Sequence, residues 1–549
     1  MDDPPDLLVD ATNVYCPDPE GAAGFYALPG MTLENAGVAI VTSATTFRGQ
    51  GVFSHVDLSG NATNFEVWNG KLYRVNASKT TFTDVTPASP AIDAAVTTRV
   101  YGTSFIGQLI ITDGVNKPWL ATNLAATPIT ATAIDFDGAG TAWAAFGPFV
   151  VYGGSVFCIL SSVGGVAARS DIAWSLTADA STGWQQTNYD FRWTLEQSLN
   201  QGSSPPLYAL APENTQLYYF RQASIGSLSG AVGPNLRGQA THDAISKNVG
   251  TMSPQSIVLF GDNIFFVDQL GRPYRLSQGT RELDPIWLNL RAVSDASTFG
   301  FPAVTQTVCT AAFETNLNLY IVAPWSSLPS QSGPPTEGHI FDARTGAYFG
   351  RFSVGPGVQM DTLGTFTDAS GRGALIVQGS AVAPTSAQVA TSGFMWSMNS
   401  LAGTGDFLTT EATPAVNLTT EDAVPVLLIT EGTTVNWQDN GVTKTVSITT
   451  TRMGYDPDMV LAVDRIAALV GTTAACQVTL STAAIAATVE GSPTPSTVQD
   501  GVSRLTIGAS GIQGRGLTAK ISPTTTTTQW SIQAVTASGV LSLAAPDEG

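Results

Sequence analysis

The chain alternates between short apolar runs and clusters of turn residues, and helical periodicity is almost absent. FEVWNGKLYRV places two strand-like runs around Asn69-Gly70, the dipeptide that best tolerates the positive φ angles of a tight hairpin. LIITDGVNKPWL repeats this arrangement around Asp113-Gly114, and IVLFGDNIFFVDQLGRPYRL at 257–276 contains two such turns. The pattern predicts a succession of β-hairpins.

A single hairpin exposes two strand edges and cannot bury both of its faces, so these units must cover one another. They follow one another at roughly the 40–50-residue spacing of propeller blades, in which each sheet packs against its neighbours around an axis. Neither the WD nor the kelch signature is present, and an array of β-sandwiches is the structural alternative. We predict an all-β protein, a β-propeller of about six to eight blades.

The C-terminal third departs from this pattern. Residues 402–451 are rich in Thr, Val and Glu, and they predict a β-rich insertion or an added small β domain. DPDMVLAVDRIAALV has apolar residues at helical spacing, including Met459, Val463 and Ile466, but it also fits a buried strand. We expect three parts in all: a propeller body at 1–401, the insertion or small domain at 402–451, and a closing blade with C-terminal strands at 452–549.

Charged residues make up 12% of the chain, about half of the roughly 25% that is usual in soluble domains. There are 24 Lys and Arg against 43 Asp and Glu, which gives a net charge of −19. Binding to phosphates without sequence preference needs clustered basic residues, so we do not expect this chain to bind DNA or RNA in that way. The low charge also suits surfaces that are buried within assemblies.

The N-terminal residues MDDPPDLLVD lack the basic and apolar regions of a secretory signal, and no run of about 20 apolar residues is present to span a bilayer. Four cysteines lie far apart and form no C-x-x-C pair: Cys16, Cys158, Cys309 and Cys476. We therefore expect buried or half-buried free thiols, and neither a disulfide framework nor a zinc site. These features predict synthesis in a reducing cytoplasm and no membrane insertion.

No motif for catalysis or metal binding is recognisable. The histidines His55, His242 and His339 are too far apart in sequence for an H-E-x-x-H or H-x-H ligand set. No G-x-S-x-G elbow or Walker phosphate loop is present, and GIQGRG at 511–516 fits a strand turn with an exposed Arg515 better than a phosphate cradle. The sequence predicts no catalytic residue, no metal ligand, no cofactor and no enzymatic activity.

Two features keep a carbohydrate-directed function open. Asp135 and Asp137 in AIDFDGAGTAW loosely resemble the Asp-box of sialidase propellers, with the spacing to Trp143 off by one residue. Such a box is a fold element, and a glycosidase would need two carboxyl groups about 5–10 Å apart. Five aromatic residues either line a sugar-binding groove or, as we favour, pack between blades or at subunit interfaces: Trp174, Trp184, Trp193, Tyr218 and Tyr219.

Several segments occur in an order known from one family. ATNVYCPDPEGAAGFYALPGMTL is followed by LIITDGVNKPWL, IAWSLTADASTGW and YALAPENTQLYYFRQASIGSLSG, and then by VGTMSPQSIVLFGDNIFFVDQLGRPYRLS. This order resembles the propeller proteins that form the tail nozzle of short-tailed bacteriophages, also called tail-hub or packaged-DNA-stabilisation proteins. The residues that match the most specific stretch of that family are Gly250, Thr251, Ser253, Pro254, Ser256, Gly261, Asp262, Phe265, Phe266, Gly271 and Arg272.

The resemblance covers most of the chain as scattered blade signatures, and 402–451 departs from it most. TTTRMGYDPDMVLAVDRIAALV and GIQGRGLTAKIS are similar to the family's closing blade, so the resemblance implies that DPDMVLAVDRIAALV is a strand. The matched residues are turn and strand residues, and none of them is catalytic. Related propellers also occur in long-tailed phages, so the tail type stays open.

The resemblance implies a structural virion protein of the phage tail that is assembled in the host cytoplasm. Six copies would form a ring below the portal and the adaptor (head–tail connector) protein, and would contact tail-fibre, needle or plug proteins. The ring would retain the packaged genome and then let it leave, and an acidic bore would repel phosphate so that DNA passes without specific binding. The alternatives are a carbohydrate-binding tail fibre or adhesin and a glycosidase-type propeller acting on host surface polysaccharide.

Overall fold

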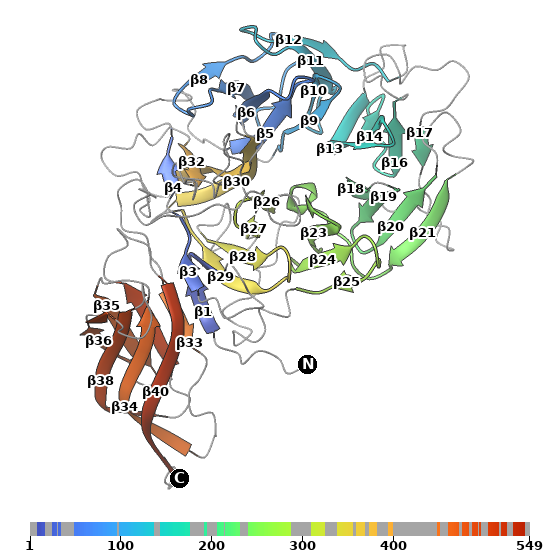
Figure 1. Ribbon diagram of the computed structural model, residues 1–549. Helices are drawn as coiled ribbons and strands as arrows, with labels where there is room; N and C mark the ends of the chain where they lie inside the picture. Colours follow the sequence, from blue (N-terminus) through green and yellow to red (C-terminus); the bar gives the residue numbers. More distant parts are fainter. Residues whose placement is uncertain are drawn as a thin grey trace, which may run out of the picture. The chain divides into compact units, whose positions relative to one another are not determined.

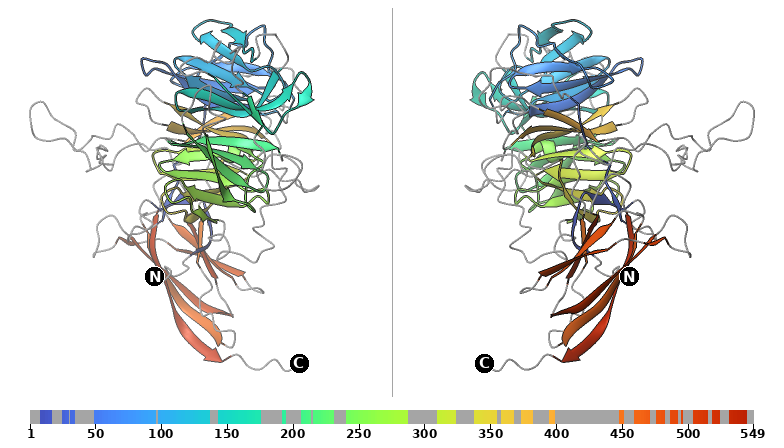
Figure 2. Two further views of the ribbon diagram at one scale, coloured as in Figure 1. Left: turned by 90° about the vertical axis from the view of Figure 1, so that its right-hand side faces the viewer. Right: turned by 90° about the vertical axis from the view of Figure 1, so that its left-hand side faces the viewer.

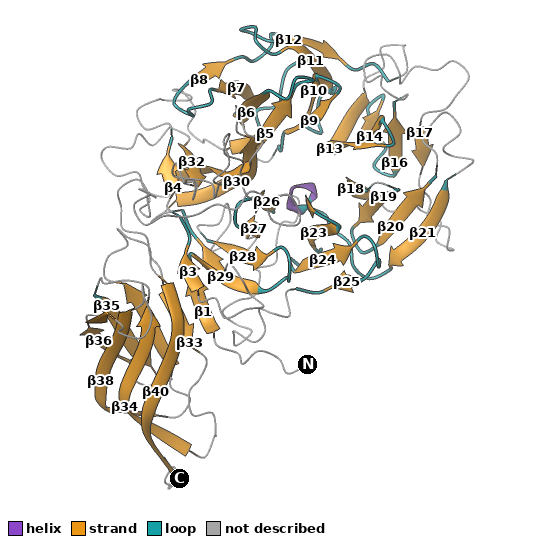
Figure 3. Ribbon diagram, viewed as in Figure 1, coloured by secondary structure: helices purple, strands orange, loops and turns teal. Residues whose placement is uncertain are grey.

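The computed structural model of the chain is built from β-strands (Figure 1). In the part of the chain that it describes, the only helical element is a short 3-10 turn, η1 (Pro254–Ser256), drawn in purple in Figure 3. None of the described residues forms a helix long and apolar enough to cross a membrane. The described residues are 8–16, 25–29, 31–34, 49–95, 98–136, 143–175, 192–194, 206–213, 215–230, 240–286, 309–323, 337–354, 358–367, 373–381, 394–398, 447–450, 459–470, 475–481, 486–491, 494–495, 503–514, 518–523 and 531–543.

The chain divides into two compact units. One is formed by Glu34–Trp396, and the other combines Met1–Leu33 with Ser397–Gly549. The first unit is a seven-bladed β-propeller, which confirms the predicted fold class (Figure 1). Figure 2 shows the sheets of this unit from two further sides, coloured from blue to yellow.

Each blade is an antiparallel sheet whose strands follow one another in sequence. Blade 1 contains β5 (Gly49–Val56), β6 (Ala62–Trp68), β7 (Lys71–Val75) and β8 (Phe82–Asp84). Blade 2 contains β9 (Tyr101–Phe105), β10 (Gln108–Thr112), β11 (Trp119–Asn123) and β12 (Thr130–Ala133). Blade 3 contains β13 (Trp143–Tyr152), β14 (Ser155–Val163), β16 (Asp171–Trp174) and β17 (Arg192–Thr194), with β15 (Val166–Ala167) beside β14.

The remaining blades repeat this plan. Blade 4 contains β18 (Leu207–Pro212), β19 (Gln216–Arg221), β20 (Ile225–Ser229) and β21 (Thr241–Ser246). Blade 5 contains β22 (Val258–Phe260), β23 (Asn263–Val267), β24 (Pro273–Ser277) and β25 (Leu283–Asp284). Blade 6 contains β26 (Thr310–Glu314), β27 (Leu319–Ala323), β28 (Gly338–Asp342) and β29 (Tyr348–Phe352), and blade 7 contains β30 (Val358–Thr367), β31 (Gly373–Ala381) and β32 (Phe394–Met398).

The predicted hairpins are confirmed, and their turn residues explain them. Asn69 and Gly70, between β6 and β7, have φ angles of 46° and 74°, as a two-residue hairpin turn of the right twist requires. The connection after β10 is longer, and the carboxylate of Asp113 organises it by accepting hydrogen bonds from the backbone N–H groups of Val115 and Asn116 at 2.9 and 2.8 Å.

The hydrophobic core is divided among the interfaces between successive blades. Phe65 and Val67 of blade 1 pack with Leu109, Ile111 and Trp119 of blade 2. Similar clusters join blades 2 and 3, 3 and 4, 4 and 5, and 5 and 6. Because burying one large apolar side chain contributes roughly 1.5–3 kcal/mol, these interfaces supply most of the stabilisation of the unit.

The ring closes between blade 7 and blade 1. Val75 packs with Phe366, Ile376 and Met395 of blade 7. The innermost strands are also joined by hydrogen bonds, since Thr362 Oγ1 donates to the carbonyl of Gly49 at 3.0 Å. Glu34, the first residue of the propeller segment, donates its N–H to the carbonyl of Met395 at 3.0 Å. The start of this segment is thereby tied to its last blade.

The second unit is also all-β. Its strands are β1 (Leu8–Thr12), β2 (Val14–Tyr15), β3 (Phe25–Ala27), β4 (Met31–Leu33), β33 (Ser447–Thr450), β34 (Met459–Val470), β35 (Cys476–Ser481), β36 (Ala486–Gly491), β37 (Thr494–Pro495), β38 (Ser503–Gly514), β39 (Thr518–Pro523) and β40 (Ser531–Leu543). Five of them pair in the order β1-β33-β39-β35-β36, and six in the order β2-β3-β40-β34-β38-β37.

This division differs from the expected one. The strands of 452–549 belong to sheets with β1, β2 and β3 instead of completing a propeller blade. DPDMVLAVDRIAALV forms the strand β34, as the resemblance implied, with its apolar residues paired along β38 and β40. The predicted insertion at 402–451 lies outside the described residues except for β33.

We expect Gly51→Ala to lower the stability of the propeller by about 2–3 kcal/mol. A Cβ atom at Gly51 would lie 2.2 Å from the carbonyl oxygen of Val100, so the innermost strands of blades 1 and 2 would have to separate. Chemical denaturation followed by tryptophan fluorescence measures the effect. Gly279→Ala is the control, because no atom lies within 4 Å of its added Cβ. Equal midpoints for the two variants would contradict this close packing.

Candidate functional site

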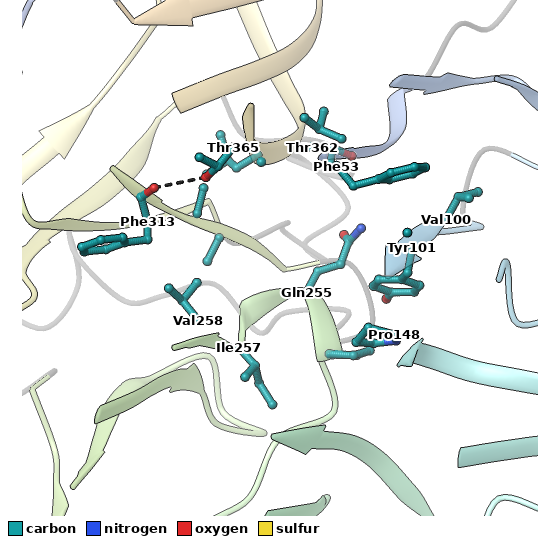
Figure 4. Close-up of a pocket in the computed structure, with 17 residues that line it drawn as sticks. Phe53, Val100, Tyr101, Pro148, Gln255, Ile257, Val258, Phe313, Thr362 and Thr365 are labelled. Atoms are coloured by element: carbon teal, nitrogen blue, oxygen red, sulfur yellow. Dashed lines mark hydrogen bonds between the residues drawn. The ribbon is translucent and has the colours of Figure 1, made fainter. Parts of the chain in front are cut away.

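A cavity of about 320 Å³ lies among the innermost strands of the propeller (Figure 4). It is lined by residues of β5, β9, β13, β22, β26 and β30 and of η1, among them Phe53, Tyr101, Gln255 and Phe313. The volume is at the lower end of the range in which small molecules bind, about 300–1,000 Å³. No Asp, Glu, His, Cys, Lys or Arg of the described part of the chain lines it. Its chemistry is therefore that of apolar contact and neutral hydrogen bonding.

Two of the polar groups in the cavity wall are already used by the fold. Thr365 Oγ1 donates to the carbonyl of Phe313 at 3.1 Å, and Thr362 Oγ1 donates to Gly49 in the ring closure. Gln255 is different, because its buried Oε1 accepts no hydrogen bond from the described residues. In Figure 4 its amide and the Tyr101 ring point toward the same space.

The Tyr101 hydroxyl keeps its proton. Burial raises the pKa of Tyr101 well above its usual range, and the nearby positive charges of Arg99 and Arg169 only partly oppose this. The phenol is therefore a hydrogen-bond donor and not a base at physiological pH. With Gln255 it gives the cavity two neutral polar groups, which suits water or a small uncharged molecule and supplies no nucleophile.

Arginine side chains connect neighbouring blades by donating to backbone carbonyl groups. Arg99 Nη1 donates to Gly49 at 2.8 Å, from blade 2 to blade 1. Arg169 donates through Nε and Nη2 to Leu207 of blade 4 at 3.2 and 3.0 Å, and its guanidinium carbon lies 3.4 Å from the centre of the Phe146 ring. The same kind of contact runs from Arg74 in blade 1 to the carbonyl of Leu124 after β11, and from Arg275 in blade 5 to the carbonyl of Arg344 in blade 6.

Glu66 is a buried acid at the closure between blades 1 and 7. Trp68 Nε1 donates to its Oε2 at 2.8 Å, and the Gln378 side chain of β31 also hydrogen-bonds to it. Burial raises the pKa of Glu66 to about 8, although both hydrogen bonds act to lower it. Oε1 of Glu66 and Oε1 of Gln378 have no partner among the described residues. A proton on Glu66 supplies the donor that these two acceptors lack.

The three histidines lie in different blades and do not converge. His55 is in β5, His242 in β21 and His339 in β28. Burial lowers the pKa of each, to about 4 for His339, so they are neutral near pH 7. No group of three or more His, Cys, Asp or Glu side chains within the described ranges is placed to hold a metal ion.

The four cysteines are free and buried, as predicted. Cys158 and Cys309 lie in blade-interface clusters, where burial raises the pKa of both thiols and makes them unreactive. Asp135 is half-buried, whereas its Asp-box companion Asp137 lies outside the described residues. Arg515 of the GIQGRG segment lies outside them as well.

Of the five aromatic residues, those whose side chains the structure describes pack against blade-interface clusters. Trp174 and Tyr218 have no exposed surface and belong to two blade-interface clusters. Tyr219 is partly buried against the first of these clusters. Trp184 and the side chain of Trp193 lie outside the described residues. Trp174 and Tyr218 therefore cannot line a sugar-binding groove in this structure.

The residues that carry the family resemblance form a junction of blades 4, 5 and 6. Thr251 donates its N–H to the carbonyl of Arg221 in blade 4 at 2.9 Å, and Ser253 Oγ donates to the carbonyl of Cys309, at the start of blade 6, at 2.6 Å. Ser256 Oγ accepts from the N–H of Val267 at 3.1 Å. In the turn after β23, the guanidinium of Arg272 donates twice to Asp268. These residues fix turns and strand junctions.

Sequence reasoning did not identify Glu66, Gln255 or the arginine contacts. Glu66 stands in an apolar–polar alternation that reads as an ordinary exposed strand position, and its partner Gln378 is more than 300 residues away in sequence. The only local signal is the neighbouring Trp68, whose indole N–H needs an acceptor when buried.

No known protein family matches the chain, and no curated protein matches it either. Solved structures with a similar fold include the C-terminal WD40 domain of Sif2, with a TM-score of 0.34 and 11% identity over 72% of this chain and 97% of that one. BamB from Moraxella catarrhalis has a TM-score of 0.34 and 11% identity over 70% and 96% of the two chains. Raptor from Chaetomium thermophilum has a TM-score of 0.38 and 9% identity over 68% of this chain and 29% of that one. The propeller assignment rests on the strand order of the chain itself.

We expect Glu66→Gln to remove part of the pH dependence of stability. An ordinary glutamate pKa of 4.5 applies in the unfolded chain, and about 8 in the folded one, so the folded state binds the extra proton. The stabilisation that comes from binding this proton is present in full below pH 4.5 and is lost as pH rises to about 8. The free energy of unfolding of the variant, taken relative to that of the wild type, should therefore rise by on the order of 2–4 kcal/mol between about pH 5 and about pH 9.

Denaturant unfolding of both proteins across this pH range measures the difference. Glu282→Gln, at an exposed position, is the matched control and should follow the wild type at every pH. A constant difference between wild type and Glu66→Gln across the range would show that the Glu66 carboxyl does not titrate between its unfolded and folded values.

Proposed function

We propose that the chain is a structural subunit of a virus particle, namely of a bacteriophage tail nozzle, and that it lets genomic DNA pass without binding it. The order of segments that resembles the nozzle family supports this proposal. So does the fold, since a closed ring of blades held by interface clusters is a rigid body, and none of the described residues that line its cavity is an Asp, Glu, His, Cys, Lys or Arg.

The observation that carries the proposal is that many Arg and Lys side chains of the propeller are held by backbone carbonyl groups or by carboxylates. Arginines of blades 1, 2, 3 and 5 donate to backbone carbonyl groups of neighbouring blades. Others are paired with carboxylates, as Arg272 is with Asp268, Arg281 with Asp243, and Arg351 with Glu337. Lys71 and Lys79 face Asp84 and Glu34 in the same way.

As a consequence, few of the described positive side chains of this acidic protein are free to contact the phosphates of DNA. Binding to the phosphates of DNA depends on releasing counterions from clustered Lys and Arg, and the surplus of acidic residues opposes it. Repulsion keeps a polyanion from adhering to a wall that it must slide past. A ring of six such subunits would carry six times the net charge of −19, with adaptor, tail-fibre and needle or plug proteins as its neighbours.

A carbohydrate-binding tail fibre and a glycosidase are not favoured by any described feature. Trp174 and Tyr218 are buried in interface clusters, and no described residue that lines the cavity carries a carboxyl group of the kind that hydrolysis of a glycosidic bond requires.

We expect the purified chain not to retain double-stranded DNA, even at low ionic strength where phosphate contacts are strongest. Gel retardation or fluorescence anisotropy with a labelled duplex measures this. A double variant, Asp262→Lys with Glu282→Lys, replaces two exposed carboxylates of blade 5 and should raise the affinity in a salt-dependent manner. Tight binding of DNA by the wild-type chain would refute passage without adhesion.

In the phage that encodes the chain, disrupting its gene should give heads that lose their DNA and lack a complete tail. Electron microscopy and nuclease protection of the packaged genome measure both effects. Complementation with the wild-type gene is the control and should restore genome retention. Particles that assemble whole tails and hold their DNA without the protein would show that it is not the nozzle.

A further inference from the structure

Four exposed apolar side chains gather at one end of the innermost strands of blades 1, 2 and 3. They are Val56 at the end of β5, Leu58 in the following turn, Ile106 after β9, and Val151 near the end of β13. Leu58 is 79% exposed and Ile106 is 48% exposed, and both are large enough to be costly in water.

These residues lie on the same face of the propeller because the innermost strands of these blades run parallel. The N–H of Val100 donates to Gln50 at one end of β5, and the N–H of Val56 donates to Ser104 Oγ at the other. Thr103 Oγ1 in β9 donates to the carbonyl of Phe149 in β13 at 2.8 Å. The strand ends and the turns that follow are therefore neighbours.

Leu58 also covers the neighbouring turn directly. A Cβ atom on Gly107 would lie 3.2 Å from Cγ of Leu58, so the leucine side chain rests on the Ile106-Gly107 turn of blade 2. Leu58 and Ile106 thus form one continuous apolar surface, which we call the Leu58–Ile106 surface.

Ile106 is an unusual residue for its position. Its φ angle is 48°, in the left-handed region that β-branched residues rarely adopt and that Asn, Asp or Gly normally occupy in a two-residue hairpin turn. About half of the side chain is in solvent, so its burial offsets only part of this strain. Strain of this kind is retained where the residue serves a purpose other than the stability of its own turn.

One ionised carboxylate adjoins the surface. Asp57 lies between Val56 and Leu58, and hydrogen bonds from Asn61 and Ser59 hold the pKa of its carboxyl below the usual value, so it stays ionised. The turns that follow the innermost strands carry no Lys or Arg wherever the structure describes them.

We propose that the Leu58–Ile106 surface is a docking site for a different protein, which presents an apolar side chain flanked by Lys or Arg. The apolar side chain covers Leu58 and Ile106, and the basic groups meet Asp57. A second copy of this chain docked through the same face would bring Asp57 against its equivalent, and like charges oppose that contact. The proposal does not depend on the nozzle function.

Three synthetic peptides of equal length serve as probes, with alternating Leu and Lys, Leu and Glu, or Ser and Lys. Fluorescence anisotropy at about 0.15 M salt keeps non-specific charge attraction small. The wild-type chain should bind the Leu/Lys peptide at least about tenfold more tightly than either of the others. Equal affinity for the Leu/Lys and Ser/Lys peptides would overturn the proposal, because charge alone would then explain the binding.

Two variants locate the binding. Leu58→Glu, at an exposed position, should weaken Leu/Lys binding about tenfold, whereas Val166→Glu should leave it within about twofold. Val166 is 70% exposed but follows the second strand of its blade, which runs the other way and ends at the opposite face. Equal loss in both variants would show that the peptide does not bind at the Leu58–Ile106 surface.

Ile106→Asn separates docking from folding. Asn tolerates the positive φ angle, so the variant should unfold at a temperature higher by roughly 1–3 °C. The same variant should lose about tenfold in Leu/Lys affinity because the apolar side chain is gone. A more stable variant with unchanged affinity would remove Ile106 from the docking site and overturn the proposal.

Discussion

The propeller depends on one constraint: every blade is a thin sheet whose two faces are both apolar, and only another blade can cover them. The clusters that join Phe65 to Leu109, and Val75 to Phe366, meet this requirement around the ring. Because each sheet is covered on both sides only when the ring is complete, the closure between blades 1 and 7 stabilises all the other interfaces as well. The buried hydrogen bonds of Gly49 and Thr362 lie at that closure.

The same constraint explains where several arginines lie. Strand ends and turns at the blade junctions leave backbone carbonyl groups that need donors, and long guanidinium side chains reach them from the next blade. These guanidinium groups keep their positive charge, but they are held at the blade junctions. The net charge of −19 is set by the composition, and the placement of these arginines is what links the fold to the proposed passage of DNA.

Local features of the structure were predictable from the sequence, and long-range ones were not. The Asn69-Gly70 turn and the strand β34 follow from turn chemistry and from the family resemblance. The Ile106-Gly107 turn has a β-branched residue at a positive φ angle, where Asn, Asp or Gly is expected, so the sequence pattern does not predict it. The hydrogen bond from Gly49 to Asp361 spans 312 residues, and no periodicity reveals which distant polar residues meet. The association of β1–β3 with strands beyond residue 447 is hidden for the same reason.

The strand order of the second unit sets a sequence of events during synthesis. Phe25 and Tyr26 of β3 pair with Ile532 and Ser531 of β40. At roughly 5–20 residues per second, a ribosome needs on the order of tens of seconds to make the intervening chain. During that interval β3 has an unsatisfied edge, while the propeller encoded between the two strands has all of its own residues available. We therefore expect the propeller to fold first on the ribosome, and the β3–β40 pairing to form only after translation has passed residue 532.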